Sequence, residues 1–392
     1  MRKITLFTNI PAPYRIPTLN DIARVTRGNL CVVLGAPSEP RRSWVFPERK
    51  MEFTCKLLSQ DGRTAGLLVG LKSALKMLLH LNRWQPSAVI CGGYDSFAAW
   101  AAFLWCKLFS RRFVLWVDST SRDHRPQGVS GQIRTALKRL IVSHADGVAP
   151  SGTASAEYTK RLGARQERTF TAPFSGDPNL FASQAGNINA VQEKRERHLP
   201  SHLILYSGRL VRSKGVLVLL EAFRSISRAL PSAGLLVVGH GPDKEEMREF
   251  CWKGKIERVF FEGPQAYERM PYYYALADAL ALPTFSDAWG VVVNEAFACG
   301  VPAVVSRAAG ACDDLIVDGE TGFAVEPGDS RDLAEKLLRV LSDASLRLRM
   351  AGNCRRVIQN YSAEACALGL LAAVEGRATP RRALNHECDC QL

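Results

Sequence analysis

The fold is decided most clearly by the stretch PTFSDAWGVVVNEAFACGVPAVV, residues 283–305. We read it as a strand end, a loop, a helix, a turn and a new strand. The helix is expected to begin near Gly290 and to end at Gly300, because glycine readily takes the left-handed conformation that terminates a helix. Pro302 prevents the helix from continuing, and the apolar residues after it start a buried strand. A helix between two buried strands predicts an α/β fold with a parallel sheet.

Two acidic residues make the same stretch a candidate binding site. Asp287 lies in the loop, and Glu295 follows eight positions later inside the helix. Open α/β sheets bind their ligands at the carboxyl ends of the strands, where this loop is expected to lie. The start of the helix also offers unpaired N–H groups to an anion.

The same alternation of apolar strands and helical patterns continues along the whole chain in two runs. In the first run we expect strands at residues 3–8, 30–34, 88–91, 113–117, 147–150 and 168–172. In the second run we expect them at residues 202–206, 234–238, 259–261, 279–282, 303–305 and 322–325. Two such runs predict an α/β protein with two doubly wound parallel sheets.

A length of 392 residues also favours two domains over one. We expect an N-terminal Rossmann-like domain over residues 1–183 and a C-terminal domain over residues 201–361. The polar residues 184–200 between them are predicted to be a linker. The predicted ending is a terminal helix at 362–376, followed by a disordered tail at 377–392.

The net charge of +13 is unevenly distributed. Residues 1–200 hold 29 Lys and Arg against 14 Asp and Glu, whereas residues 201–392 hold 22 against 24. An excess confined to one half indicates an anionic partner such as nucleic acid, anionic lipid or a phosphorylated substrate. A generically basic surface is the alternative interpretation.

A long helical pattern at residues 64–84 bears on this choice. Lys72, Lys76, His80 and Arg83 recur every three or four residues and predict one basic stripe, while most other positions are apolar. This pattern is typical of an interfacial membrane helix, and also of a helix packed on its sheet with one solvated face. No apolar run reaches eighteen residues and no signal peptide is recognisable, so we expect a cytoplasmic protein with a peripheral membrane role.

Cysteine usage agrees with a cytoplasmic location. Most of the eleven cysteines fall in apolar strands or helices, which predicts reduced core residues. The terminal sequence HECDC supplies one histidine and two cysteines, too few for a four-ligand site, and we expect no bound metal.

The loop GRLVRSKG, residues 208–215, carries the second candidate site. Arg209 and Lys214 are suited to clamp a diphosphate, Arg as a planar fork and Lys as a point charge. The turn at Gly239–Pro242 and the acidic pair in 283–305 also follow predicted strands. Three such loops are expected to converge on one edge of the sheet.

These segments, in this order and at these spacings, resemble glycosyltransferase family 4. The resemblance rests on SGRLVRSKGVLVLLEAF, LLVVGHGPDKEEM, VFFEGPQ and ALPTFSDAWGVVVNEAFACGVPAVVS, which together cover nearly all of residues 201–361. NIPAPYRIPTLNDIA, GGYDSFAAW and VAPSGTASAEYTKRLGA are similar to N-terminal segments of bacterial members. The resemblance implies the GT-B architecture of two Rossmann-like domains facing across a cleft, with the terminal helix at 362–376 crossing back to the N-terminal domain. It also implies transfer from a nucleotide-sugar donor with retention of configuration and without a bound metal, and the sequence contains no Asp-x-Asp motif.

Carried over position by position, the resemblance assigns catalytic roles to four residues. Arg209 and Lys214 would hold the donor diphosphate. The family's Glu-x7-Glu motif falls on Asp287 and Glu295, so Glu295 would bind the donor ribose and Asp287 the transferred sugar. Asp in place of the first Glu shortens that side chain by one methylene. Seven further residues are predicted to line the donor site: Gly208, Gly239, Gly241, Gly263, Gln265, Gly290 and Asn294.

The acceptor side resembles the family less closely. Many members have a histidine at the end of an N-domain strand, where this chain has Asp118, with His124 six residues later. Tyr14 and Arg15 lie in a Pro-rich loop where members have a Gly-rich loop. We treat these four residues as candidates for the acceptor site.

The sequence therefore predicts a retaining glycosyltransferase of a bacterial surface-polysaccharide pathway, acting at the inner face of the plasma membrane. Its substrates would be a UDP- or GDP-linked sugar, with no other cofactor, and a saccharide or polyprenyl-linked acceptor. The alternatives are a non-catalytic nucleotide-sugar-binding or scaffold protein and a GT-B nucleotide-sugar epimerase. Nucleic-acid binding is suggested by charge alone, since no matching motif is present.

Overall fold

The computed structural model describes residues 2–37, 50–59, 66–122 and 129–377. The chain divides into two compact units. Unit 1 consists of Met1–Ser119, Arg125–Ser175 and Asn360–Leu392, and unit 2 of Thr120–His124 and Gly176–Gln359. Three predicted features lie outside the described residues: His124, the tail from residue 378 and most of the loop at 37–50.

Unit 1 is built on a six-stranded sheet with the order β3-β2-β1-β4-β5-β6, in which every pair is parallel. The chain direction across the sheet reverses between β1 and β4, which makes this pair the topological switch point. The strands are β1 (Ile4–Thr8), β2 (Leu30–Leu34), β3 (Thr54–Leu57), β4 (Ala88–Gly92), β5 (Arg112–Val117) and β6 (Gly147–Pro150).

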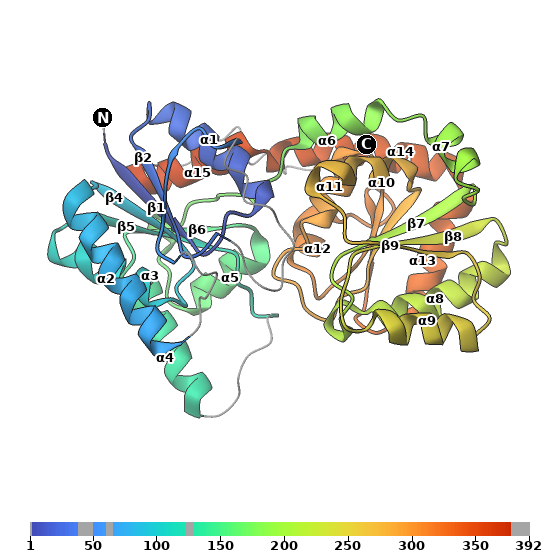
Figure 1. Cartoon of the computed structure of the whole chain (residues 1–392), viewed down its shortest axis with the longest axis horizontal. Coiled ribbons are helices and arrows are strands. Elements are labelled where there is room, and N and C mark those ends of the chain that lie inside the picture. Colours follow the sequence, from blue (N-terminus) through green and yellow to red (C-terminus); the bar gives the residue numbers. More distant parts are fainter. Residues whose placement is uncertain (1, 38–49, 60–65, 123–128, 378–392) are drawn as a thin grey trace, which may run out of the picture. The chain divides into compact units, whose positions relative to one another are not determined.

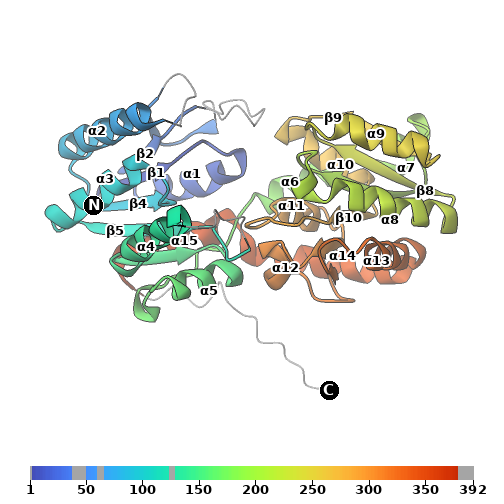
Figure 2. The ribbon, with the colours of Figure 1, turned by 90° about the horizontal axis from the view of Figure 1, so that it is seen from below.

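Helices cover both faces of this sheet, which explains why its inner strands are mostly apolar and buried. One core joins the sheet to α2 (Leu67–Trp84), α3 (Phe97–Leu108), α4 (Val129–Ser143) and α5 (Thr153–Arg161). The other joins it to α1 (Ile16–Val25) and α15 (Ala363–Glu375). The last helix of the chain thus packs in unit 1, where the Arg112 side chain donates a hydrogen bond of 2.8 Å from Nε to the Ala373 carbonyl. Figure 2 shows α2, α3 and α4 following one another across the same layer.

Unit 2 repeats the topology with a second six-stranded parallel sheet, in the order β12-β11-β10-β7-β8-β9. Here the switch point lies between β7 and β10, the first and fourth strands of the unit. The strands are β7 (His202–Ser207), β8 (Ala233–Val238), β9 (Val259–Gly263), β10 (Ala279–Leu282), β11 (Ala303–Ser306) and β12 (Gly322–Val325). The predicted α/β class with two doubly wound parallel sheets is confirmed.

The helices of unit 2 also form two layers, visible in Figure 1 above and below its sheet. One layer contains α8 (Val216–Ala229), α9 (Lys244–Lys253) and α13 (Ser330–Ser342), joined to the sheet by one large core. The other contains α6 (Pro178–Gly186), α10 (Met270–Leu276) and α11 (Val292–Ala298), which contact one another. The remaining helices are α7 (Ala190–Glu196), α12 (Gly310–Leu315) and α14 (Ala344–Ile358).

Three local predictions differ from the structure. The strand expected at 168–172 is replaced by a 3-10 turn at Gln166–Arg168 and a single bridge from Thr169 to β6. β3 was not predicted, because this short edge strand is mostly solvated and shows no apolar alternation. The segment 184–200, expected to be an interdomain linker, contains the end of α6 and all of α7 and belongs to unit 2, where Lys194 forms a 2.8 Å ion pair with Asp278. Its polar composition therefore reflects ion pairing within unit 2.

The predicted basic stripe on α2 also needs correction, because His80 is buried at 6% exposure. Its Nε2 lies 3.2 Å from the Thr5 hydroxyl in the core of unit 1. Burial lowers the pKa of His80 to about 4, so the ring is neutral at pH 7. Lys72, Lys76 and Arg83 remain as the exposed cations of this helix.

Candidate functional site

In unit 2, the loops that follow β7 and β10 are joined backbone to backbone at the switch point. The Phe285 amide and the Thr284 hydroxyl both donate hydrogen bonds to the Ser213 carbonyl, at 2.9 and 3.0 Å. Gly215 allows this approach, since its φ is +68° and an added Cβ would lie 1.9 Å from the Pro283 carbonyl oxygen. The residues of both loops are therefore held in fixed positions relative to each other.

Lys214 and Asp287 form an ion pair across these two loops. The Lys214 ammonium lies 2.5 Å from Asp287 Oδ2 and 3.2 Å from the Ser286 carbonyl. Asp287 is anchored in turn, because its other carboxylate oxygen accepts a 3.3 Å hydrogen bond from the Trp289 amide. The pair places a positioned cation at the carboxyl edge of the sheet, where anionic ligands of this fold bind.

Arg209, the second predicted cation, is exposed in the same loop. Its carbonyl accepts a 2.7 Å hydrogen bond from the buried Tyr206 hydroxyl. Its guanidinium makes no ion pair within the described part of the chain. Arg209 therefore keeps its donors available for a ligand, whereas Lys214 already has a partner.

Glu295 lies at the start of α11 and is 7% exposed. Burial raises the pKa of Glu295 to about 7, although the Tyr274 hydroxyl, which donates a 2.6 Å hydrogen bond to Oε2, acts in the opposite direction. The carboxyl group is thus poised to ionise near neutral pH. Tyr274 was not predicted as a site residue, because PYYYAL looked like an ordinary helix core and gave no other signal.

The predicted glycines of the donor site pack against one another. An added Cβ on Gly239 would lie 1.8 Å from the Gly208 carbonyl oxygen, and one on Gly241 would lie 2.1 Å from that of Leu210. The Gly239 amide donates a 2.8 Å hydrogen bond to the Gly263 carbonyl. The loops after β7 and β8 and the end of β9 therefore meet as closely packed backbone.

The other three predicted donor-site residues lie beside these loops. The Gln265 side chain donates a 2.9 Å hydrogen bond to the Glu262 carbonyl. Gly290 precedes α11 with a φ of +99°. Asn294 is buried, and its side-chain oxygen accepts a 2.7 Å hydrogen bond from the Trp289 indole. Asn294 thus supports the loop that carries Asp287.

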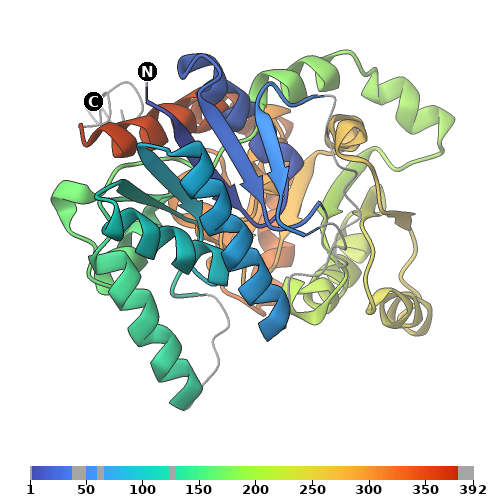
Figure 3. The ribbon, with the colours of Figure 1, turned by 60° about the vertical axis from the view of Figure 1, so that its left-hand side comes forward.

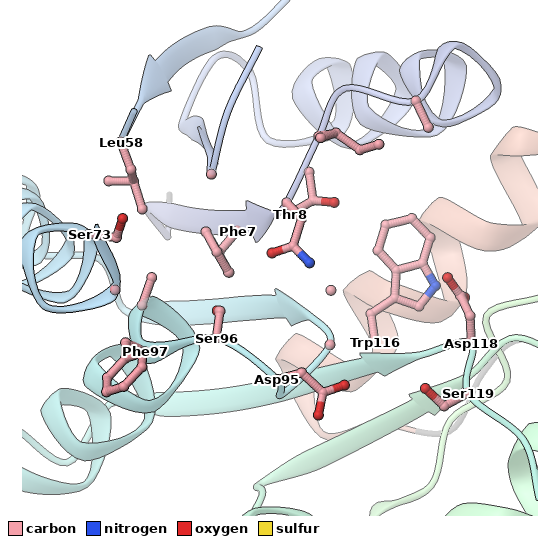
Figure 4. Close-up of a pocket in the computed structure, with 18 of the residues that line it drawn as sticks. Phe7, Thr8, Leu58, Ser73, Asp95, Ser96, Phe97, Trp116, Asp118 and Ser119 are labelled. Atoms are coloured by element: carbon pink, nitrogen blue, oxygen red, sulfur yellow. The ribbon is translucent and has the colours of Figure 1, made fainter. Parts of the chain in front are cut away.

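Unit 1 contains a pocket of about 860 Å³ at the carboxyl ends of β1, β4 and β5. Three of the predicted acceptor residues, Tyr14, Arg15 and Asp118, line it. Figure 4 shows Thr8 at the end of β1 and Trp116 near the end of β5, with Asp118 beside Trp116. β4 lies between these two strands in the sheet. The pocket therefore occupies the switch point of unit 1, which is the expected ligand position in this fold.

Arg15 is the central polar group of this pocket. Its guanidinium pairs with Asp118, lies 4.3 Å from the centre of the Trp116 ring and donates a 3.3 Å hydrogen bond to the Thr8 hydroxyl. Three buried polar atoms at this spot have no hydrogen-bond partner among the described residues: Arg15 Nε, Asp118 Oδ1 and Trp116 Nε1. Two donors and one acceptor beside an aromatic ring suit a ligand rich in hydroxyl groups. Trp116 was not predicted, because it lies in an apolar strand and resembled a core residue.

The described residues show neither a metal cluster nor a membrane-spanning helix. In residues 2–37, 50–59, 66–122 and 129–377, no three His, Cys, Asp or Glu side chains are grouped so as to hold a metal ion. Among the same residues, no helix combines the length and apolar character needed to cross a bilayer. The nine cysteines described there are free thiols, and all except Cys55 are buried.

Comparison with known proteins identifies the family. The model of the family described as "Glycosyl transferases group 1" matches residues 188–357. The capsular polysaccharide biosynthesis glycosyltransferase CapM of Staphylococcus aureus is 30% identical over 303 residues, which cover 76% of this chain and 78% of CapM. The chain belongs to the group 1 glycosyltransferases.

A further relative, the D-inositol 3-phosphate glycosyltransferase of Xylanimonas cellulosilytica, is 30% identical over 270 residues. That match covers 66% of this chain and 62% of the relative, so the chain spans less than two thirds of the relative's length.

Solved structures agree on the fold. Anabaena Alr3699/HepE, crystallised with UDP and glucose, has a TM-score of 0.76 at 20% identity, covering 96% of this chain and 100% of HepE. WaaG, a glycosyltransferase involved in lipopolysaccharide biosynthesis, has a TM-score of 0.69 at 18% identity, covering 94% of this chain and 98% of WaaG. These likenesses support the assignment of both Rossmann-like units to the GT-B fold.

Proposed function

We propose that this protein is a retaining glycosyltransferase that moves a sugar from a nucleotide-sugar donor to a saccharide or polyprenyl-linked acceptor. The observation that carries this proposal is the Lys214–Asp287 pair at the switch point of unit 2, with Arg209 exposed in the same loop. Negative charge grows on the leaving diphosphate as the bond to the sugar breaks. Positioned cations stabilise that charge, so the reaction would need no separate cofactor.

The two acidic residues take different roles in this proposal. Glu295 would accept hydrogen bonds from the donor ribose, because its carboxylate is buried beside the helix start and has only Tyr274 as a hydrogen-bonding side chain in the described structure. Asp287 would face the transferred sugar while Lys214 and the Trp289 amide hold it in place. Retention of configuration is inferred from the resemblance to family 4.

The acceptor is assigned to the pocket of unit 1. Asp118, Arg15 and Trp116 offer the unpaired donors and acceptor there, and Tyr14 contributes to its lining. The names of CapM and WaaG associate those proteins with capsular polysaccharide and lipopolysaccharide. By analogy we place this protein in bacterial surface-polysaccharide synthesis, in the cytoplasm at the inner face of the plasma membrane.

The proposal is tested first through the donor. A thermal-shift screen of UDP- and GDP-linked sugars should raise the Tm for one series, since about 100-fold excess over Kd stabilises the folded state by about 2.7 kcal/mol. Lys214→Ala and Glu295→Ala should lose that shift, and Arg212→Ala, which removes an exposed cation paired with Glu246, should keep it.

A chain that shows no shift with any nucleotide sugar is not the proposed enzyme. Donor binding with no transfer to extracted cell-envelope saccharides or lipids would favour a non-catalytic scaffold protein. Asp287, which stands where the family's motif has Glu, is the residue that suggests this alternative. Conversion of the donor into its epimer without an acceptor would favour a nucleotide-sugar epimerase.

A further inference from the structure

The helix α2 exposes a row of leucines that no part of the described structure covers. Leu67, Leu68, Leu71, Leu75 and Leu79 are between 49% and 74% exposed. At 3.6 residues per turn they fall within an arc of about 120°. The opposite side of the helix packs into the core through Met77 and Leu81. We call these five residues the leucine face.

Cations lie directly beside the leucine face. Lys72, Lys76 and Arg83 occupy the next arc of about 60° on the helix wheel, between the leucines and the buried side. Lys72 and Arg83 make no ion pair within the described residues, whereas Lys76 donates a 2.7 Å hydrogen bond to the Leu58 carbonyl. α2 contains no acidic residue at all.

The two neighbouring helices of the layer have the same character. α3 exposes Leu104 and Leu108, and α4 exposes Ile133, Leu137 and Leu140. Neither helix contains Asp or Glu, and α4 adds the exposed cations Arg134 and Arg139. Lys138 of α4 is largely buried and lies 3.8 Å from Asp95, so it does not belong to this surface. Figures 1 and 3 show α2, α3 and α4 on the same side of unit 1. The outer side of the layer is therefore apolar and cationic together.

The leucine face begins at the edge of the pocket in unit 1. Leu67 and Phe97, which are 66% and 46% exposed, both line that pocket. Gly70, one turn further along α2, packs against the Phe97 ring and lines the pocket as well. An apolar surface is thus continuous with the rim of the proposed acceptor site.

We propose that the leucine face docks unit 1 on an anionic lipid bilayer and brings the rim of the acceptor pocket to the membrane surface. The acceptor would then be an amphiphile, with a saccharide head group that enters the pocket and a lipid chain that stays in the bilayer. This statement of substrate class rests on the proposed transferase function. The docking itself rests on the surface alone.

The charges favour a bilayer over a second copy of this chain. A two-fold dimer through the leucine face would bring Lys72 and Arg83 of both copies together without acidic partners, which is repulsive. Anionic lipid head groups supply the missing negative charge, and leucine side chains bury in the boundary between head groups and acyl chains.

The experiment is sedimentation of the purified full chain with vesicles of phosphatidylcholine, alone or mixed with phosphatidylglycerol. Binding should require phosphatidylglycerol and should weaken between about 0.1 M and about 1 M salt, as the Debye length falls from about 10 to about 3 Å.

The triple change Leu71→Gln/Leu75→Gln/Leu79→Gln should weaken binding to these vesicles by about tenfold or more. Lys72→Gln/Arg83→Gln should weaken it mainly at low salt. The matched control is Leu348→Gln on α14, a leucine of unit 2 that is 75% exposed and should leave binding unchanged.

Two results would overturn the docking proposal. One is that the protein binds vesicles with and without phosphatidylglycerol equally well, or binds neither. The other is a leucine-dependent dimer seen by sedimentation velocity, which would make the face an interface between copies. Nucleotide-sugar binding is measured on the same variants and should match wild type. If the wild-type chain binds nucleotide sugars but does not bind vesicles, only the docking proposal is rejected. If it binds vesicles but no nucleotide sugar, the proposed glycosyltransferase function is rejected.

Discussion

The two units share one topology and use the same edge of the sheet differently. In unit 1 a cation from the loop after the first strand, Arg15, pairs with Asp118 at the end of β5. In unit 2 the corresponding loop supplies Lys214, which pairs with Asp287 after β10. The pair of unit 1 borders a pocket and leaves polar atoms unpaired, whereas the pair of unit 2 is fixed between packed backbone segments.

This difference teaches that the fold supplies the position of a site, and the loops decide what it holds. The outer surfaces diverge as well. One helix layer of unit 1 is cationic and exposes leucines, while the excess of positive charge disappears after residue 200. The predictions below test whether the pair of unit 2 acts on the donor and that of unit 1 on the acceptor.

The largest effect is expected from Lys214→Ala. Loss of one positioned group that stabilises developing charge typically lowers kcat by about 10²–10³-fold. Steady-state transfer with the donor identified by thermal shift measures it. Arg212→Ala, two residues earlier in the same loop but exposed, is the control and should stay near wild type. Wild-type turnover by Lys214→Ala would remove the donor assignment from unit 2.

An intermediate effect is expected from Arg15→Lys, which keeps the charge but loses the planar contact with Trp116 and part of the pairing with Asp118. The KM for the acceptor should rise by about 10–100-fold, the range of a lost charged hydrogen bond. Donor affinity should be unchanged. Arg24→Lys on the exposed side of α1, which pairs with Glu52, is the matched control. A change in donor affinity and not in acceptor KM would reverse the assignment of the two units.

The smallest effect is a pH dependence of donor binding through Glu295. Since burial raises the pKa of this carboxyl to about 7, the ionised form that accepts ribose hydroxyls is the minor species at pH 6 and the major one at pH 8. The Kd for a nucleotide sugar should therefore fall by about tenfold over this interval, as the competent fraction rises from about 0.1 to about 0.9. Calorimetry on Glu295→Gln, which cannot titrate, should give a flat profile. An equally steep profile in that variant would assign the titration to another group.

Much of this arrangement was predictable from the sequence. The stretch 283–305 and the loop 208–215 combine turn glycines, buried strands and charged residues, so local chemistry places Lys214 and Asp287 at strand ends. The polar segment at 184–200 misled prediction, because its ion pairs within unit 2 depend on residues distant in sequence, such as Asp278. His80 misled it for the same reason, since helical periodicity does not reveal which side of a solvated stripe turns into the core.

The sequence by itself determined the class of the fold, the two runs of parallel strands and the identity of the charged residues at their ends. These follow from periodicity and turn chemistry, which act between neighbours in the chain. Only the tertiary structure decided that Lys214 meets Asp287, that Tyr274 reaches Glu295 and that Trp116 lies under Arg15. It also decided that five leucines of α2 stay exposed beside a pocket. Burial and pairing depend on which surfaces the packing of distant segments covers, and that is a property of the whole fold.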